Sequence, residues 1–188
     1  MIDIMLPELQ KVPSRREISV FLKKFNFKIL CEVGVRDGEN LCNILKAEPT
    51  EMVAVDIWKE DTNFRSRNPL YFSQADLDRQ LNVVIGLQKT HPSIRIVRDL
   101  SVEAAKQFPD NYFDYVYIDA DHSYEAVRDD IKAWYPKVRQ FGVLGGHDYI
   151  RNQEKIFEGV NKAVNEFIGA YKLCTHFEIS NSWYTIKP

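Results

Sequence analysis

Long apolar runs, paired cysteines and an excess of basic charge are all missing from this 188-residue sequence. Because no run approaches about 20 apolar residues, no membrane-spanning segment is expected, and no signal peptide pattern opens the chain. The three cysteines form no C-x-x-C pair, which favours buried, reduced thiols in a cytoplasmic protein over disulfides or a zinc site. A formal net charge of −2 disfavours nucleic-acid binding by phosphate neutralisation.

The order of apolar segments predicts the fold. Continuous apolar runs, typical of buried parallel strands, alternate with segments of helical periodicity. Two alternating segments joined by a short turn close the chain and indicate a hairpin. We therefore predict a doubly wound α/β domain with a Rossmann-like seven-stranded sheet, mainly parallel, ending in a C-terminal antiparallel hairpin. The expected strands are residues 28–33, 52–56, 94–97, 115–118, 142–145, 171–179 and 182–187.

Residues 1–27 are expected to form a helical extension in front of a main domain over residues 28–188. Ser14 and Glu17 have the spacing of a capping box, and apolar residues follow them at helical intervals. Residues 57–74 show no periodicity, and a loop of this length in a compact domain is usually functional. This loop is expected to shape a substrate pocket.

A glycine turn after the first expected strand is the most informative feature. The strand carries Glu32 and is followed by Gly34 and Gly38 in the pattern E-x-G-x-x-x-G, and then a helix begins. Such a turn brings the backbone close to a nucleotide-like ligand at the carboxyl end of a strand. A dinucleotide fingerprint has a further glycine, and the acidic residues Asp37 and Glu39 at the helix start would repel a phosphate. The turn therefore suits a ligand that carries positive charge and no phosphate, although glycines also serve ordinary strand-to-helix turns.

Asp56 ends the second expected strand, 18 residues after Gly38. A carboxylate in this position can accept hydrogen bonds from both hydroxyl groups of a ribose. Together with the acidic glycine turn, it indicates S-adenosylmethionine, which has a ribose, a sulfonium and an ammonium group but no phosphate.

Polar side chains also follow the fourth and fifth expected strands. Asp119 and His122 come after the fourth, and His147 and Asp148 come after the fifth. The carboxyl ends of these strands meet beside the first strand, so the four side chains are expected to converge. Asp119 and Asp148 offer hard oxygen ligands for Mg²⁺ or Mn²⁺, and His122 could act as a general base. His147 could serve instead as the base or be a hydrogen-bonded loop residue.

These segments resemble the class I S-adenosylmethionine-dependent methyltransferases, and more narrowly methyltransferase family 24, which is related to macrolide-sugar O-methyltransferases. The resemblance covers about residues 28–170. It is carried by Cys31 to Leu41, Asp56, Phe113 to Val127 and Gly142 to Tyr149. His147 departs from it, because catechol-type relatives have an oxygen ligand at that place.

The resemblance implies a role for each matched residue. The cofactor contacts would be Glu32, Gly34, Gly38, Asp56, Asp99 near the adenine, and Asp119. The metal ligands would be Asp119 and Asp148, and the catalytic residues would be His122, as the base, and Asp119.

The sequence therefore predicts a methyltransferase that acts on a hydroxyl group of a small molecule. Assistance by a metal ion and assembly into a homo-oligomer are both left open by the sequence. Neither nucleic acid nor a membrane is an expected partner. Three rivals remain: a metal-free N-methyltransferase, a nicotinamide-dependent oxidoreductase, which the missing glycine disfavours, and a binding protein that keeps the cofactor without the chemistry.

Overall fold

The structure is a computed structural model that describes residues 1–60, 72–150 and 158–188. Seven strands form one sheet in the order β3-β2-β1-β4-β5-β7-β6. The strands are β1 (Ile29–Val33), β2 (Glu51–Asp56), β3 (Ile94–Arg98), β4 (Phe113–Ile118), β5 (Val138–Gly146), β6 (Thr175–Phe177) and β7 (Trp183–Ile186). The first five strands run parallel, and β7 is antiparallel to both β5 and β6. The predicted doubly wound sheet with an antiparallel hairpin is confirmed.

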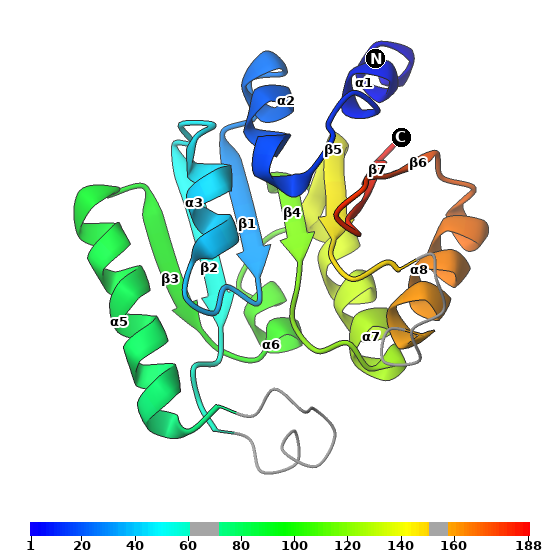
Figure 1. The fold of residues 1–188 in the computed structure, drawn as a ribbon. Coiled ribbons are helices and arrows are strands. Elements are labelled where there is room, and N and C mark those ends of the chain that lie inside the picture. Colours follow the sequence, from blue (N-terminus) through cyan, green and yellow to red (C-terminus); the bar gives the residue numbers. More distant parts are fainter. Residues whose placement is uncertain (61–71, 151–157) are drawn as a thin grey trace.

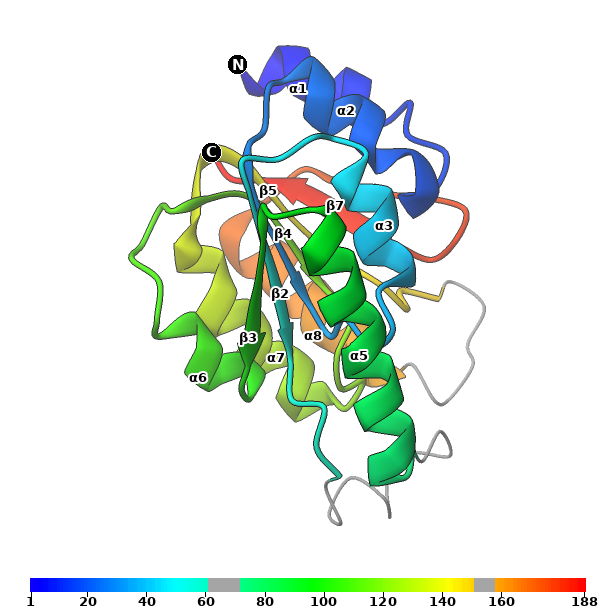
Figure 2. The same cartoon turned by 90° about the vertical axis from the view of Figure 1, so that its left-hand side faces the viewer.

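Helices cover both faces of the sheet (Figures 1 and 2). One face carries α1 (Ile2–Leu9), the 3₁₀ turn η1 (Arg15–Glu17), α2 (Ile18–Lys24), α3 (Glu39–Leu45) and α5 (Gln74–Thr90). The other face carries α6 (Ser101–Ala105), α7 (Tyr124–Trp134) and α8 (Glu158–Tyr171), with the 3₁₀ turn η2 (Tyr135–Lys137) after α7. Each face has its own apolar core, because successive strand residues point to opposite sides.

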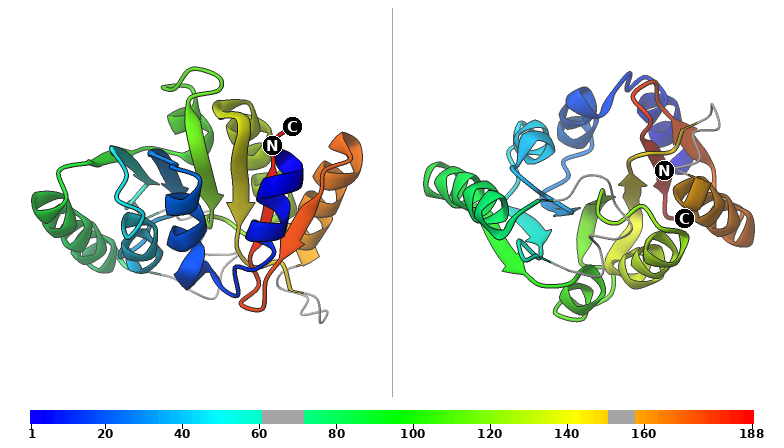
Figure 3. Two further views of the ribbon diagram at one scale, coloured as in Figure 1. Left: turned by 90° about the horizontal axis from the view of Figure 1, so that it is seen from above. Right: turned by 60° about the horizontal axis from the view of Figure 1, so that its bottom comes forward.

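The N-terminal residues pack into the first of these cores. Met5, Leu9 and Ile18 are buried in the same cluster as the strand residues Leu30 and Tyr115. The first helix also lies against β7, so the two ends of the chain are close together (Figure 3). Residues 1–27 are thus packed on the sheet near β1, β4 and β7.

Several local expectations are corrected. The capping box at Ser14 is wrong, because Ser14 precedes a 3₁₀ turn and its side chain makes no capping hydrogen bond. A capping box does form at Ser73, whose side chain and that of Asp76 bond reciprocally at the start of α5. Of the three cysteines, only Cys31 is buried, and Cys42 and Cys174 are exposed.

No helix among the described residues is long and apolar enough to cross a membrane. Residues 61–71, which make up most of the loop expected to shape the substrate pocket, lie outside the described residues.

Candidate active site

The strand order places the candidate site at the carboxyl ends of β1 and β4. The chain runs from β1 outward to β3 and then returns to β4 on the other side of β1. A crevice opens where the winding of such a sheet reverses, and ligands of open α/β sheets bind there. All the residues predicted from sequence as site residues lie on strands β1 to β5 or in the segments that follow them.

Both glycines of the turn after β1 have the left-handed backbone that favours glycine, with φ of +86° at Gly34 and +85° at Gly38. Gly38 is the N-cap of α3. A Cβ atom on Gly34 would lie 2.1 Å from the carbonyl oxygen of Asp119. The glycine therefore lets the segment after β4 pass directly against the turn after β1, which joins the two predicted groups of residues into one site.

Glu32 lies within β1 rather than at its end, and its side chain is buried. Asn40 of α3 donates a hydrogen bond of 2.8 Å to Oε1 of Glu32, while Oε2 has no hydrogen-bond partner among the described residues. Burial raises the pKa of Glu32 to about 8, and the negative charges of Asp119 and Asp56 act in the same direction. An unpartnered buried carboxyl oxygen is costly, so this position favours a bound donor or cation.

Asp56 ends β2 and is anchored by backbone amides. Its two carboxylate oxygens accept hydrogen bonds from the amides of Arg36, at 2.8 Å, and Trp58, at 3.0 Å. The indole of Trp58 in turn donates to the carbonyl of Arg36 at 2.8 Å. These bonds hold the carboxylate beside the glycine turn, and each oxygen keeps a lone pair for a further donor.

Asp99 follows β3 and uses its carboxylate locally. It accepts hydrogen bonds from the amide of Leu100, at 2.8 Å, and from the side chain of Gln107, at 3.2 Å. Asp121, after β4, accepts a bond of 2.7 Å from the amide of Ser123 at the start of α7. That contact is a local side-chain-to-backbone turn just before the helix, and it needs no ligand.

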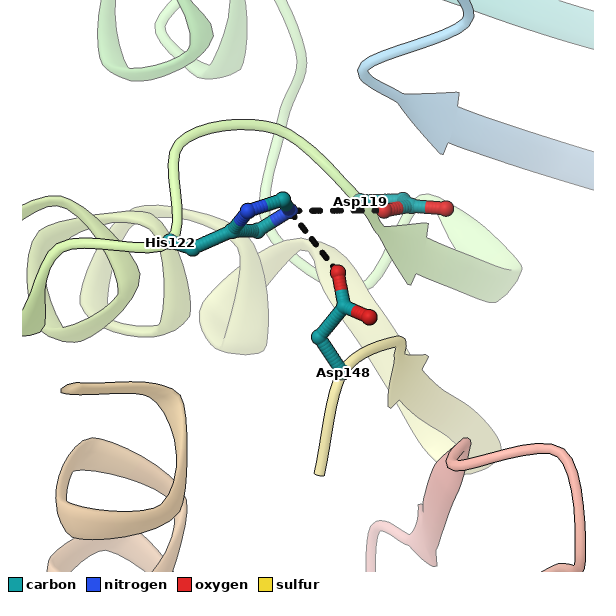
Figure 4. A group of neighbouring side chains, drawn as sticks. All are labelled: Asp119, His122 and Asp148. Atoms are coloured by element: carbon teal, nitrogen blue, oxygen red, sulfur yellow. Dashed lines mark ion pairs between the residues drawn. The ribbon is translucent and has the colours of Figure 1, made fainter. Parts of the chain in front are cut away.

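The acidic and imidazole side chains predicted after β4 and β5 do converge (Figure 4). Nε2 of His122 lies 2.9 Å from Oδ2 of Asp148 and 3.8 Å from Oδ1 of Asp119. The ligand-type atoms of Asp119, His122 and Asp148 all lie within 4.8 Å of one another. Two strands far apart in sequence thus supply one compact group of two carboxylates and an imidazole.

His147 extends this group on the other side of Asp148. Its Nδ1 lies 3.0 Å from Oδ1 of Asp148 and 3.9 Å from Oδ1 of Asp119. Its Nε2 contacts the carbonyl oxygen of Ser180, in the β6–β7 turn, at 2.9 Å. Because a carbonyl only accepts, Nε2 carries a proton, so His147 is both a site residue and a hydrogen-bonded loop residue.

The mutual attraction of these groups shifts their proton affinities. Burial by itself would lower the pKa of His122, but Asp119 and Asp148 raise it to about 10. Burial would also lower the pKa of His147, which the same two carboxylates raise. Burial would raise the pKa of Asp148, but the two histidines hold it below its usual range. At neutral pH His122 is therefore an imidazolium that pairs with the carboxylate of Asp148.

Arg15 is a member of the site that the sequence did not predict. It lies in η1, and its Nη1 donates a hydrogen bond of 2.8 Å to Oδ2 of Asp119. Burial would lower the pKa of Arg15, but Tyr117 and Asp119 raise it above its usual range. In the sequence, the arginines of Ser14-Arg15-Arg16-Glu17 read as the solvated start of a helix. No local signal distinguishes one of them as a residue of the sheet edge.

Comparisons with known proteins identify the family. A sequence profile of the methyltransferase domain known as methyltransferase family 24 matches residues 31–149. The chain belongs to this methyltransferase family. The match runs from β1 to the end of the candidate site at Tyr149, so Arg15 lies outside it. No curated protein matches the sequence of this methyltransferase.

Solved structures share the fold of the methyltransferase at low sequence identity. A putative caffeoyl-CoA O-methyltransferase from Staphylococcus aureus is 14% identical with a TM-score of 0.67, covering 100% of this chain and 92% of its own. A Podospora anserina methyltransferase with SAH bound is 8% identical with a TM-score of 0.65, covering 90% and 75%. The O-methyltransferase NovP is 15% identical with a TM-score of 0.64, covering 95% and 79%.

The chain is thus an S-adenosylmethionine-dependent methyltransferase, and its residues fit that cofactor. The unpartnered oxygen of Glu32 and the carboxylate of Asp56 lie on either side of the glycine turn. Both are acceptors, which suit the ammonium and ribose hydroxyl groups of the cofactor. The individual contacts to Glu32, Gly34, Gly38, Asp56, Asp99 and Asp119 stay predictions.

A divalent metal ion fits the same site less well. Asp119, His122 and Asp148 are close enough to share an ion. However, Arg15 already holds one oxygen of Asp119, and His122 and His147 hold both oxygens of Asp148. The carboxylates are therefore neutralised by cations of the chain itself, and no catalytic step is assigned here to a metal.

Proposed function

We propose that this enzyme transfers a methyl group from S-adenosylmethionine to a hydroxyl oxygen of a small-molecule acceptor. The observation that carries the proposal is Nε2 of His122, which lies between the carboxylates of Asp148 and Asp119. The backbone of Asp119 in turn lies against the glycine turn. A hydroxyl group needs to lose its proton during methylation, whereas a neutral amine needs only to be positioned. A base held by two carboxylates is therefore better suited to an oxygen acceptor.

The proposed chemistry uses the residues of the chain as follows. The cofactor supplies an electrophilic methyl group on its sulfonium. His122 first has to release the proton that it shares with Asp148. Neutral His122 then accepts the hydroxyl proton of the acceptor, and Asp148 and Asp119 stabilise the imidazolium that forms. The acceptor oxygen forms the new bond to the methyl carbon as the bond from that carbon to sulfur breaks. Holding the two reactants in line supplies much of the remaining rate.

The fold relatives support an oxygen acceptor without deciding it. Two of them are named O-methyltransferases, one of them for caffeoyl-CoA. A phenolic or sugar-like hydroxyl is accordingly the class of acceptor that we propose. We also propose that residues 1–27 form an extension on the acceptor side of the main domain, over residues 28–188, and that the protein works in the cytoplasm.

Two measurements test the proposal: binding of S-adenosylhomocysteine and identification of the methylated products. Calorimetry with S-adenosylhomocysteine should show binding to the full chain, and incubation with panels of phenols, sugars and amines should give O-methylated products by mass spectrometry. The His122→Ala variant should reduce kcat by about 10²–10⁴-fold with little change in cofactor affinity. The exposed histidine His91 provides the control, because His91→Ala leaves the site intact.

Two outcomes would contradict the proposal. Products methylated only on nitrogen would favour the N-methyltransferase rival. A normal kcat in His122→Ala, combined with loss of activity in His147→Ala, would place the base after β5 instead of after β4.

A further inference from the structure

The contact between Arg15 and Asp119 brings a permanent cation to the carboxyl end of β4. Nη1 of Arg15 and Oδ2 of Asp119 are 2.8 Å apart, and the two side chains are 22% and 21% exposed. The pair is therefore mostly shielded from water, unlike the neighbouring pair of Arg16 and Glu39, which are 3.9 Å apart and 75% and 69% exposed. A shielded ion pair is screened weakly, so the charge of Arg15 acts on the whole site.

The charge of Arg15 opposes the binding of a metal ion at Asp119. Asp119 turns Oδ2 to Arg15 and Oδ1 toward His122 and His147, at 3.8 and 3.9 Å. A divalent ion bound between Asp119 and Asp148 would have to share Asp119 with the guanidinium at close range. Repulsion between two cations at such a distance is strong where water is partly excluded.

A guanidinium also has donors to spare. It carries five N–H groups, and the acceptors that the described residues offer to Arg15 are Asp119 and the hydroxyl group of Tyr117. The remaining N–H groups can therefore bind an oxygen atom of a ligand at this edge of the sheet. That is the task of a metal ion in a metal-dependent methyltransferase, which holds the acceptor oxygen while its proton leaves.

We propose that Arg15 is the cation of this active site: it occupies Asp119 in place of a metal ion and binds the acceptor oxygen, so that methyl transfer needs no metal. The inference rests on the proposed function, because it assigns Arg15 to the acceptor of the same reaction. It also gives residues 1–27, which lie outside the family match, a chemical role in the site.

The first test measures the affinity of the protein for Mn²⁺ and does not depend on enzyme activity. Manganese binding is followed by electron paramagnetic resonance in the wild type and in Arg15→Met, with Arg16→Met as the matched control. The wild type and Arg16→Met should bind Mn²⁺ only weakly, with Kd in the millimolar range. Arg15→Met should bind it at least tenfold more tightly, because Asp119 is then free of the guanidinium that competes with the metal ion. Arg15→Lys keeps the charge and should remain a weak binder.

The second test uses turnover. With an acceptor from the panels above, wild-type release of S-adenosylhomocysteine should be unchanged by excess chelator, and Arg15→Lys should retain more activity than Arg15→Met. Arg16→Met should match the wild type. If Arg15→Met does not fold, as judged by circular dichroism, Arg15→Gln carries the same expectations, since it can still bond to Asp119 without a charge.

Tight Mn²⁺ binding by the wild type, an unchanged affinity in Arg15→Met, or loss of turnover in chelator would each overturn the inference. The proposed function fails separately, through absence of S-adenosylhomocysteine binding or of O-methylated product. The manganese measurements do not depend on either of those results.

Discussion

The pairing of His122 with Asp148 predicts how the stability of the protein changes with pH. The variant His122→Asn removes the titrating group and leaves a side chain of similar polarity between the two carboxylates. The pKa of His122 is about 10 in the folded protein against an ordinary value of 6.5 in the unfolded chain. A raised pKa means that the folded state binds the proton more tightly, so the stabilisation is complete below pH 6.5 and is lost as the pH rises through 10.

The size of the effect follows from the shift. At 1.36 kcal/mol for each unit, the charged form of His122 stabilises the fold by about 5 kcal/mol at pH 6, about 3 kcal/mol at pH 8 and less than about 1 kcal/mol at pH 10. The difference in unfolding free energy between the wild type and His122→Asn should therefore shrink by about 4 kcal/mol from pH 6 to pH 10.

Urea unfolding at pH 6, 8 and 10, followed by circular dichroism, measures this difference. Groups far from the site titrate alike in both proteins and cancel when the two are compared at the same pH. As a control, His91→Asn changes an exposed histidine and should alter stability by less than about 0.5 kcal/mol at each pH. A difference between wild type and His122→Asn that stays constant with pH would refute the ion pair as the source of the stabilisation.

Further predictions concern the glycine turn, the cofactor and the thiols. Asp56→Ala should weaken the binding of S-adenosylhomocysteine by about 1.5–3 kcal/mol in calorimetry, the cost of losing a charged hydrogen-bonding group, and unchanged affinity would show that Asp56 does not contact the ribose. Gly34→Ala should destabilise the protein by more than about 4 kcal/mol, because its Cβ would overlap backbone after β4. Gly86→Ala, in α5 with open space around it, should stabilise by about 0.5–1 kcal/mol, and equal effects in urea unfolding would contradict this reasoning. A thiol reagent should label two cysteines in the native protein and the buried Cys31 only after unfolding.

Local patterns that the sequence carries in full could be predicted correctly. The central strands β1, β2 and β4 are buried on both faces, so their residues form continuous apolar runs. The capping box at Ser73 depends only on Ser73 and Asp76, three residues apart, so its signal is also local. In contrast, β5 begins at Val138, four residues before the expected Gly142, because its first residues include polar ones that the apolar pattern excluded.

Patterns that allow two local outcomes were decided by packing. Ser14 and Glu17 have the spacing of a capping box, yet the segment forms a 3₁₀ turn that carries Arg15 to Asp119. The local spacing contains no information about the contact between Arg15 and Asp119, which are 104 positions apart in the chain. Two of the cysteines assigned to the interior are likewise exposed: Cys42 lies on the outer face of α3, and Cys174 lies between α8 and β6. Residue type alone does not say which positions the packing buries.

The sequence by itself determined the doubly wound fold class, the glycine turn, and the placement of Asp56, Asp119 and Asp148 at strand ends, since apolar runs and glycines are local features. Only the tertiary structure decided which charges meet. It turned His122 between two carboxylates and brought Arg15 onto Asp119. Electrostatic interactions depend on the distance between charges in space and on their shielding from water, and the spacing of residues along the chain determines neither of these.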